Sequence, residues 1–249
     1  MIKTLYAAVA LADLLGQAAG TQQTFHCATT EGRILARIVG EHHADIDDWP
    51  WQVLLKGTSP DGSALTCGGS ITSPRCILTV APSLVHENGT ILAVYQLRYS
   101  VVYGHGRPLN HTGVPADRLI PYQEFNPGTL ENDIALIRLN ENTPELRLIQ
   151  LPSERLENVV ARPELCATVV GWGITSEGAQ GSSGTLHRAD LPVLRNSDRA
   201  VADPGEVTTS LFFAGYGQGG VESCQGASGG ALMVRHGNNN RHVQVGVVS

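Results

Sequence analysis

The sequence predicts an all-β fold, and three observations support this prediction. Short runs rich in valine, isoleucine, leucine and aromatic residues recur after residue 37, at intervals of roughly ten to fifteen residues. Clusters of glycine, proline, serine and asparagine lie between these runs, as at residues 57–62 and 237–240. Beyond the leader, no window of helical length carries an apolar stripe with helical period. Such a chain is expected to form a sandwich or barrels of short strands.

The expected strands cover, in chain order, residues 51–55, 76–80, 91–104, 133–139, 166–173, 210–216, 231–234 and 243–249. A polar stretch punctuated by proline, residues 140–152, is expected to link two halves. We therefore place the first half at residues 38–145 and the second at residues 146–249.

The N-terminal segment has the layout of a secretory signal peptide. Lys3 precedes an apolar run over residues 5–15, and small residues follow at positions 18–20. Because Asp13 interrupts this run, an ordinary first helix is the alternative. The run is too short to span a bilayer. We assign residues 1–20 to the signal peptide and the polar residues 21–37 to a leader.

Composition narrows the classes of partner. The formal net charge of the 249 residues is −6, and lysine and arginine are scattered, so the chain offers no basic stripe for a nucleic acid. The triplets that begin at Asn88 and Asn110 match the acceptor pattern for N-glycosylation. Together with the signal peptide, they predict a secreted, extracellular protein with no membrane span.

Three short motifs could carry chemistry. Ser228 lies among glycines in SCQGASGGA, where a tight turn can expose the hydroxyl and converge backbone N–H groups, although a flexible turn is the plain alternative. Asp133 precedes an apolar strand, where a buried carboxylate can orient an imidazole or simply cap the strand. Cleavage between Arg37 and Ile38 would create a new α-amino group that could reorganise a site.

Taken in this order, the motifs resemble the chymotrypsin/trypsin family of serine proteases. The similarity runs from Arg37 to Ser249 and rests on RIVG, WPWQVLL, CGGSITS, CILTVA, NDIALIRL, VVGWG, FFAGY, ESCQGASGG and VGVVS. The resemblance implies two antiparallel Greek-key β-barrels with the active site between them. The family continues beyond the position of Ser249 through a closing strand and a helix, so the second barrel is expected to be truncated at its C-terminus.

The resemblance assigns roles to individual residues. It matches Asp133 to the catalytic aspartate and Ser228 to the nucleophile, and it matches Ser249 to the serine beside the aspartate. The amides of Gly226 and Ser228 match the oxyanion hole. Arg37 and Ile38 match the activation cleavage site.

The decisive departure from the family is Pro82. Where the family has leucine, threonine, alanine, alanine, histidine and cysteine, this chain has LTVAPS, so Pro82 replaces the catalytic histidine and Ser83 replaces a cysteine. Proline has no titratable group and cannot accept the proton of Ser228. Loss of a triad histidine costs about a million-fold in rate. His86, four residues downstream, is the alternative base, but it falls in a predicted surface turn.

Two further positions depart from the family. Ala227 replaces the aspartate that receives the new N-terminus after activation. Glu222 stands at the specificity position, where aspartate would mark a preference for arginine or lysine. With the chain ending at Ser249, no complete specificity pocket is expected.

The cysteines also lack the partners that the resemblance implies. It pairs Cys67 with the position of Ser83, Cys166 with that of Val234, and Cys224 with a position beyond Ser249. Phe213 also stands at a family cysteine position. Cys27 has no evident mate, and Cys76 stands where the family usually has tryptophan. Cys67 and Cys76 flank an expected hairpin near residues 73–74, but its register does not place them opposite each other, so no bridge between them is expected.

These observations favour a secreted, non-catalytic serine-protease homologue that acts by binding another protein, as a cofactor, decoy or inhibitor of a secreted enzyme. The second interpretation is an active trypsin-like endopeptidase that uses another base such as His86, and the third is a truncated copy without function. No cofactor is expected. No metal site is expected either, since the pair His42 and His43 lacks partners at ligand spacing.

Overall fold

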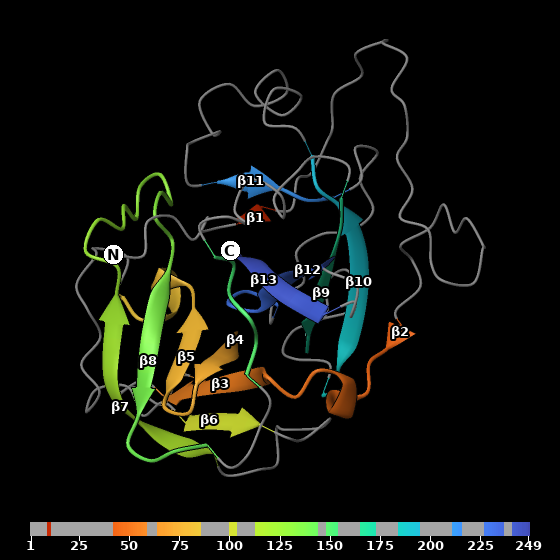
Figure 1. Cartoon of the computed structure of the whole chain (residues 1–249). Helices are drawn as coiled ribbons and strands as arrows, with labels where there is room; N and C mark the ends of the chain where they lie inside the picture. The colour runs from red at the N-terminus through yellow and green to blue at the C-terminus, as the bar shows by residue number, and fades with distance from the viewer. Residues whose placement is uncertain are drawn as a thin grey trace.

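The fold is built almost entirely from strands. The computed structural model describes residues 9–10, 42–58, 64–85, 100–103, 113–143, 148–153, 165–172, 184–194, 211–215, 227–236 and 241–249. The helices in this part of the chain are two short 3-10 helices, η1 (Ile46–Asp48) and η2 (Ala81–Ser83). The predicted all-β class is therefore confirmed (Figure 1).

The first half forms a closed barrel. Its strands follow the order β3-β4-β5-β8-β7-β6, and every neighbouring pair is antiparallel, including the pair of β6 with β3 that closes the barrel. Closure removes the free sheet edges on which other chains could pair. The strands are β3 (Gln52–Thr58), β4 (Ala64–Ser73), β5 (Cys76–Thr79), β6 (Ser100–Tyr103), β7 (Val114–Pro121) and β8 (Ala135–Leu139).

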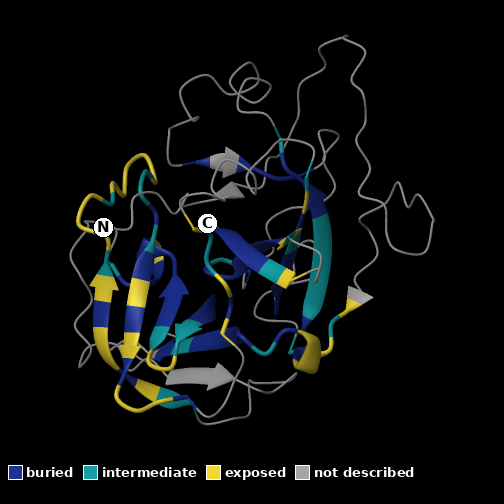
Figure 2. Ribbon diagram, viewed as in Figure 1, coloured by how far each residue is buried: buried dark blue, intermediate teal, exposed yellow. Residues whose placement is uncertain are grey.

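Strand β8 shows why these residues form a barrel wall. Its side chains alternate between buried and exposed along the strand, as expected when one face of a sheet covers a core (Figure 2). Ile137 and Leu139 point into the core and are fully buried, whereas Arg138 faces outward and pairs with Asp117 at 2.5 Å.

A second antiparallel sheet lies beside the barrel, with the order β13-β12-β9-β10-β2. Its curled, antiparallel arrangement agrees with the two-barrel fold that the resemblance implies. The strands are β13 (Arg241–Val247), β12 (Ala231–His236), β9 (Cys166–Gly171), β10 (His187–Pro192) and β2 (His42–His43). Two short strands, β1 (Val9–Ala10) and β11 (Phe212–Phe213), pair in parallel.

The barrel and the second sheet share one apolar core. Trp51 and Ile77 of the barrel belong to the same buried cluster as Trp172 and Met233 of the second half. The indole Nε1 of Trp51 contacts Sδ of Met233 at 3.2 Å. The two halves therefore bury apolar surface against each other as well as within themselves.

Residues 148–153 contact both halves. The N–H of Ile149 donates to the carbonyl of Ile71 in the barrel at 3.0 Å. The carbonyl of the next residue, Gln150, accepts from the N–H of Gln244 in β13 at 2.9 Å. A side-chain bond also crosses the junction, since the hydroxyl of Ser70 donates to Oε1 of Gln244 at 2.7 Å.

The strand register contradicts the pairing that the resemblance implies between Cys166 and the position of Val234. Strand β12 places Val234 opposite Ala167, not opposite Cys166. Because neighbouring residues of a strand face opposite sides of the sheet, Ala167 is buried and Cys166 is exposed. The expectation that Cys166 lacks a partner is also wrong. Cys166 forms a disulfide, and its partner cysteine lies outside the described residues. Cys67 and Cys76 are free thiols, as expected.

The part of the chain that the structure describes includes no helix of the length and apolarity needed to cross a bilayer.

Candidate functional site

Asp133 reaches the interior through a turn with an unusual backbone. Leu130 and Asn132 both have positive φ angles, 55° and 60°, which non-glycine residues seldom adopt. The side-chain nitrogen of Asn132 donates to the carbonyl of Glu124 at 3.0 Å and so holds this turn. Asp133 follows directly, just before β8, and its side chain is fully buried.

Both carboxylate oxygens of Asp133 accept hydrogen bonds. The N–H of Ala81 donates to Oδ1 at 2.7 Å, and the hydroxyl of Ser249 donates to Oδ2. Burial raises the pKa of Asp133 to about 6, although the bonds from Ser249 and Ala81 act to lower it. The carboxylate is thus held in place by a backbone amide and a hydroxyl, and it has no histidine partner among the described residues.

Pro82 occupies the middle of η2, directly after the amide that binds Asp133. A proline near the start of a helical turn fits, because its fixed φ suits that position and it needs no N–H partner there. Its ring is exposed, whereas Ala81 and Ser83 on either side are buried. The structure therefore places a side chain without a titratable group where the resemblance places the catalytic base.

Ser83 lies beside the thiol of Cys67. Burial raises the pKa of Cys67, the hydrogen bond with Ser83 lowers it, and the negative charge of Asp133 raises it further. The position that the resemblance gives to a disulfide is therefore taken by a half-buried cysteine next to a buried serine.

Ser228 lies in a tight turn that packs against the barrel. The N–H of Gly68 in β4 donates to the carbonyl of Ser228 at 2.6 Å. Within the turn, the N–H of Gly230 donates to the carbonyl of Ala227 at 2.8 Å. Gly229 has a φ of 86°, and a Cβ there would overlap the carbonyl of Gly68, so only glycine fits.

The structure brings the turn and the buried carboxylate to the same place. The N–H of Gly229 donates to the carbonyl of Val248 at 2.6 Å, and the next residue, Ser249, binds Asp133. Two hydrogen-bonded pairs therefore link the turn of Ser228 to Asp133. Gly229, the neighbour of Ser228, binds Val248, and Ser249, the neighbour of Val248, binds Asp133. The Ser228 side chain is partly exposed there.

Ala227 places a methyl group where the resemblance expects a carboxylate. It is 8% exposed and belongs to an apolar cluster with Ala214, Leu232 and Val248. A buried ammonium group would find no charged partner in such a cluster.

Other predicted site residues lie outside the described residues, so their roles stay predictions. They are Gly226 of the oxyanion hole, Glu222 of the specificity site, Arg37 and Ile38 of the cleavage site, the alternative base His86, and the acceptors Asn88 and Asn110.

Sequence reasoning missed two supporting groups. The hydroxyl of Thr79 donates to the carbonyl of Gly68 at 2.9 Å, and so fixes the strand that binds Ser228. The second group is the amide of Ala81, which binds Asp133. A threonine inside the apolar run CILTV was a signal for the first, because a buried hydroxyl needs a partner, whereas a backbone amide leaves no trace in a sequence.

Comparison with known proteins agrees with the fold. The family model described as Trypsin matches residues 38–249. The chain is 31% identical over 221 residues to the suppressor of tumorigenicity 14 protein homolog of Bos taurus. The matched region covers 86% of this chain and 25% of that protein. It is 34% identical over 224 residues to serine protease 56 of Homo sapiens, covering 87% of this chain and 35% of the relative.

The mouse protein of the same name is 32% identical over 223 residues, with 87% of this chain and 35% of the relative covered. This chain thus spans a quarter to about a third of the length of these relatives. The matched range includes the barrel, the second sheet and the turn around Ser228. The chain belongs to the trypsin family.

Proposed function

We propose that this chain is a secreted, non-catalytic member of the trypsin family that acts by binding another protein. The observation that carries the proposal is Pro82, which follows the amide that binds Asp133 and stands where the family has its histidine. The chain would serve as a cofactor, decoy or inhibitor of a secreted enzyme, because a protease fold without a catalytic base can still present its surface to another protein.

Among the described residues, Asp133 does not replace the missing base. A serine hydroxyl is a weak nucleophile unless an adjacent group takes its proton. The carboxylate of Asp133 is fully buried, and both of its oxygens already accept hydrogen bonds. Within the described part of the chain, no hydrogen bond joins the Ser228 hydroxyl to this carboxylate.

Ala227 supports the proposal independently. Its methyl group lies in an apolar cluster, so a new N-terminus created after Arg37 would find no carboxylate at this position. Cleavage is therefore not expected to organise the turn around Ser228. Two separate requirements of hydrolysis are missing, while the scaffold that presents loops to a partner is kept.

A turnover assay tests the proposal. Purified protein, with and without cleavage after Arg37, is incubated with peptide and ester substrates that have arginine, phenylalanine or alanine at the cleaved position. We expect a kcat/KM lower than that of an active family member by about a million-fold, the cost of losing the triad histidine. Turnover that Ser228→Ala abolishes would overturn the proposal.

Two further variants separate the alternatives. His86→Ala should leave any residual turnover unchanged, whereas its loss would assign the base to His86. Binding is tested by affinity capture from the native secretion, with Ser228→Ala beside the wild type. Equal capture of one defined secreted protein by both forms supports binding without hydrolysis. Failure of the purified chain to melt cooperatively would instead favour a copy without function.

A further inference from the structure

Two histidines far apart in sequence lie opposite each other at the edge of the second sheet. Strand β2 pairs with β10 in antiparallel fashion, and the register sets His43 against His187. The centres of their rings are 5.1 Å apart, with the ring planes at 36°. His43 is exposed and His187 is half-buried, so solvent reaches the pair.

The hydrogen-bond pattern of this strand pair brings the two side chains close. The N–H of Ala44 donates to the carbonyl of Leu186 at 2.9 Å, which makes that neighbouring pair the hydrogen-bonded one. Bonded and non-bonded pairs alternate along antiparallel strands, so His43 and His187 form a non-bonded pair. Side chains of non-bonded pairs are the closest across a sheet, and both lie on the same face.

The ring separation fits two ligands of one metal ion. With a metal–nitrogen distance of about 2.1 Å, the centre of a coordinating imidazole lies about 3 Å from the ion. Two such rings in a tetrahedral arrangement then have centres about 5 Å apart. The observed separation of 5.1 Å between the ring centres matches this spacing.

We propose that His43 and His187 form a site for a divalent transition-metal ion, Zn²⁺ or Cu²⁺, in which water completes the coordination. Imidazole nitrogen is a preferred ligand of both ions. The described residues include no group of three or more histidine, cysteine, aspartate or glutamate side chains that could hold a metal, so the proposed site has two ligands from this part of the chain and the rest from water.

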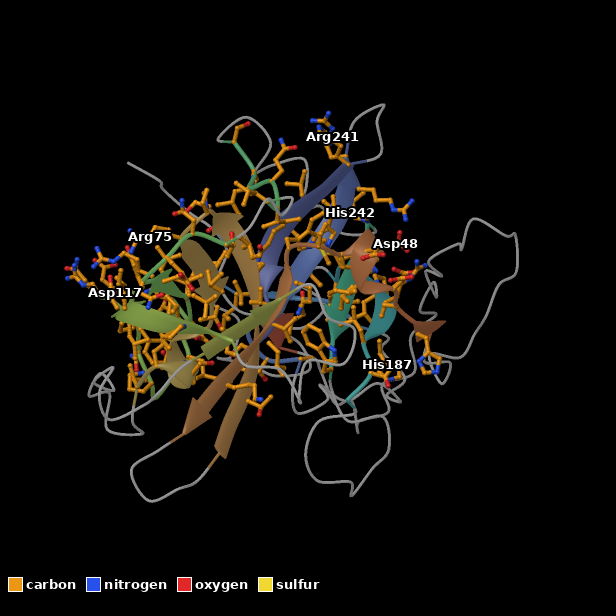
Figure 3. All side chains as sticks on the ribbon, turned by 90° about the horizontal axis from the view of Figure 1, so that it is seen from below. Asp48, Arg75, Asp117, His187, Arg241 and His242 are labelled. Carbon is orange, nitrogen blue, oxygen red and sulfur yellow. The ribbon has the colours of Figure 1, made fainter. Side chains whose placement is uncertain are left out.

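The described histidines His242 and His236 do not compete for this site. The ring of His242 packs on Trp49 at 4.7 Å and on Trp51 at 5.6 Å, and burial lowers its pKa. It lies well apart from His187 in Figure 3. His236 is on β12, away from the edge that β2 forms.

A bound ion would tie β2 to β10. Strand β2 comprises two residues and pairs with β10 at the edge of the sheet, so few backbone bonds hold it. Coordination by one side chain from each strand would close a loop of about 140 residues and stabilise the folded chain by mass action.

Titration of the full chain with ZnCl2 tests the site. The thermal midpoint of wild type should rise with ZnCl2 and return when EDTA is added. In His43→Gln and His187→Gln the apparent affinity should fall at least about tenfold, because loss of outer partners alone costs 10–100-fold. The matched control His236→Gln should behave as wild type. No rise in wild type, or an equal rise in all four proteins, would overturn the proposal.

Electron paramagnetic resonance with one equivalent of CuCl2 gives a second readout. We expect hyperfine structure from two imidazole nitrogens in wild type and in His236→Gln, and from fewer in either site variant. A wild-type spectrum without two-nitrogen coupling would contradict the site even if both site variants failed to fold.

Discussion

Asp133 is a fully buried carboxylate, and its burial links the stability of the chain to pH. Its pKa is about 6 in the folded chain, above the ordinary value of 3.8. Between these two values the folded state binds more protons than the unfolded state, so stability falls as the pH rises. The contribution is fully present below about pH 4 and is lost above about pH 6, and it amounts to about 3 kcal/mol.

We therefore predict that Asp133→Asn stabilises the chain at neutral pH. The amide keeps the shape of the carboxyl group and carries no charge, so the free energy of unfolding should rise by up to about 3 kcal/mol at pH 7.5 and change little at pH 4. Urea denaturation of both proteins at the two pH values measures this difference. An equal change in the free energy of unfolding at both pH values would show that ionisation of Asp133 does not cause the pH dependence.

A second prediction concerns Ser83. Because its side chain lies against the thiol of Cys67, Ser83→Cys should form a disulfide that closes a loop of roughly 15 residues, worth about 3 kcal/mol. Mass spectrometry after alkylation in denaturant should find Cys67 protected and Cys76 still modified. The double variant Cys67→Ser with Ser83→Cys should lose the gain in stability, whereas alkylation of Cys67 in Ser83→Cys would refute the contact.

At this scale the sequence predicted residue identities better than residue contacts. Pro82, which the resemblance matches to the position of the catalytic histidine, is visible in one motif of the sequence. Of the two donors to Asp133, the sequence predicted Ser249, because it belongs to a family motif. It did not predict the backbone amide of Ala81, because an amide is present at almost every residue. The pairing implied for Cys166 was wrong, since a shift of one residue turns a strand side chain to the other face of the sheet.

Among the elements, the turn before β12 is the most constrained. Gly229 combines a positive φ with contacts that leave no room for a methyl group, from the carbonyl of Gly68 and the hydroxyl of Thr79. The turn is thus held against β4 and β5 by shape as well as by hydrogen bonds.

Gly229→Ala should therefore destabilise the chain by about 3 kcal/mol or more, since backbone strain and overlap add. The control is Gly128→Ala, whose new methyl would meet only the side chain of Asn126, at 3.3 Å, in an exposed turn. We expect the control to change the free energy of unfolding by less than about 1 kcal/mol. Similar losses in both variants, measured by urea denaturation, would contradict the close packing of Gly229.

Strands with a strong apolar pattern were predicted from the sequence, and polar ones were not. Strands β3, β5, β8, β12 and β13 coincide with apolar runs. Strand β4 escaped prediction because Gly68 and Gly69 interrupt its pattern, although Gly68 fits the close approach of the turn around Ser228 and Gly69 fits that of the neighbouring strands β3 and β5. Strands β7 and β10 each carry one aspartate and one arginine, and their pairing in the sheet makes them strands.

The whole molecule is held together across the junction of its two halves. The hydroxyl of Ser70 in the barrel binds Oε1 of Gln244 in the second sheet, and both side chains are fully buried. Apolar residues of both halves also belong to one cluster. We therefore expect far-ultraviolet circular dichroism and tryptophan fluorescence to report a single unfolding transition.

Ser70→Ala should weaken this junction by about 1 to 3 kcal/mol, because it leaves Oε1 of Gln244 buried without its donor. Ser73→Ala, on the same strand but half-buried, should cost less than about 0.5 kcal/mol. If Ser70→Ala splits the unfolding into two transitions, the hydrogen bond couples the halves. If it changes neither stability nor cooperativity, the junction does not depend on it.

We propose that this chain keeps the fold of a protease without its chemistry. The most direct measurement is the rate at which a fluorophosphonate modifies Ser228, followed by intact mass and peptide mapping. We predict no adduct at Ser228 in wild type, before or after cleavage at Arg37, under conditions that label an active family member completely. Stoichiometric modification of Ser228 in the folded wild-type chain would contradict the proposal that the chain is non-catalytic.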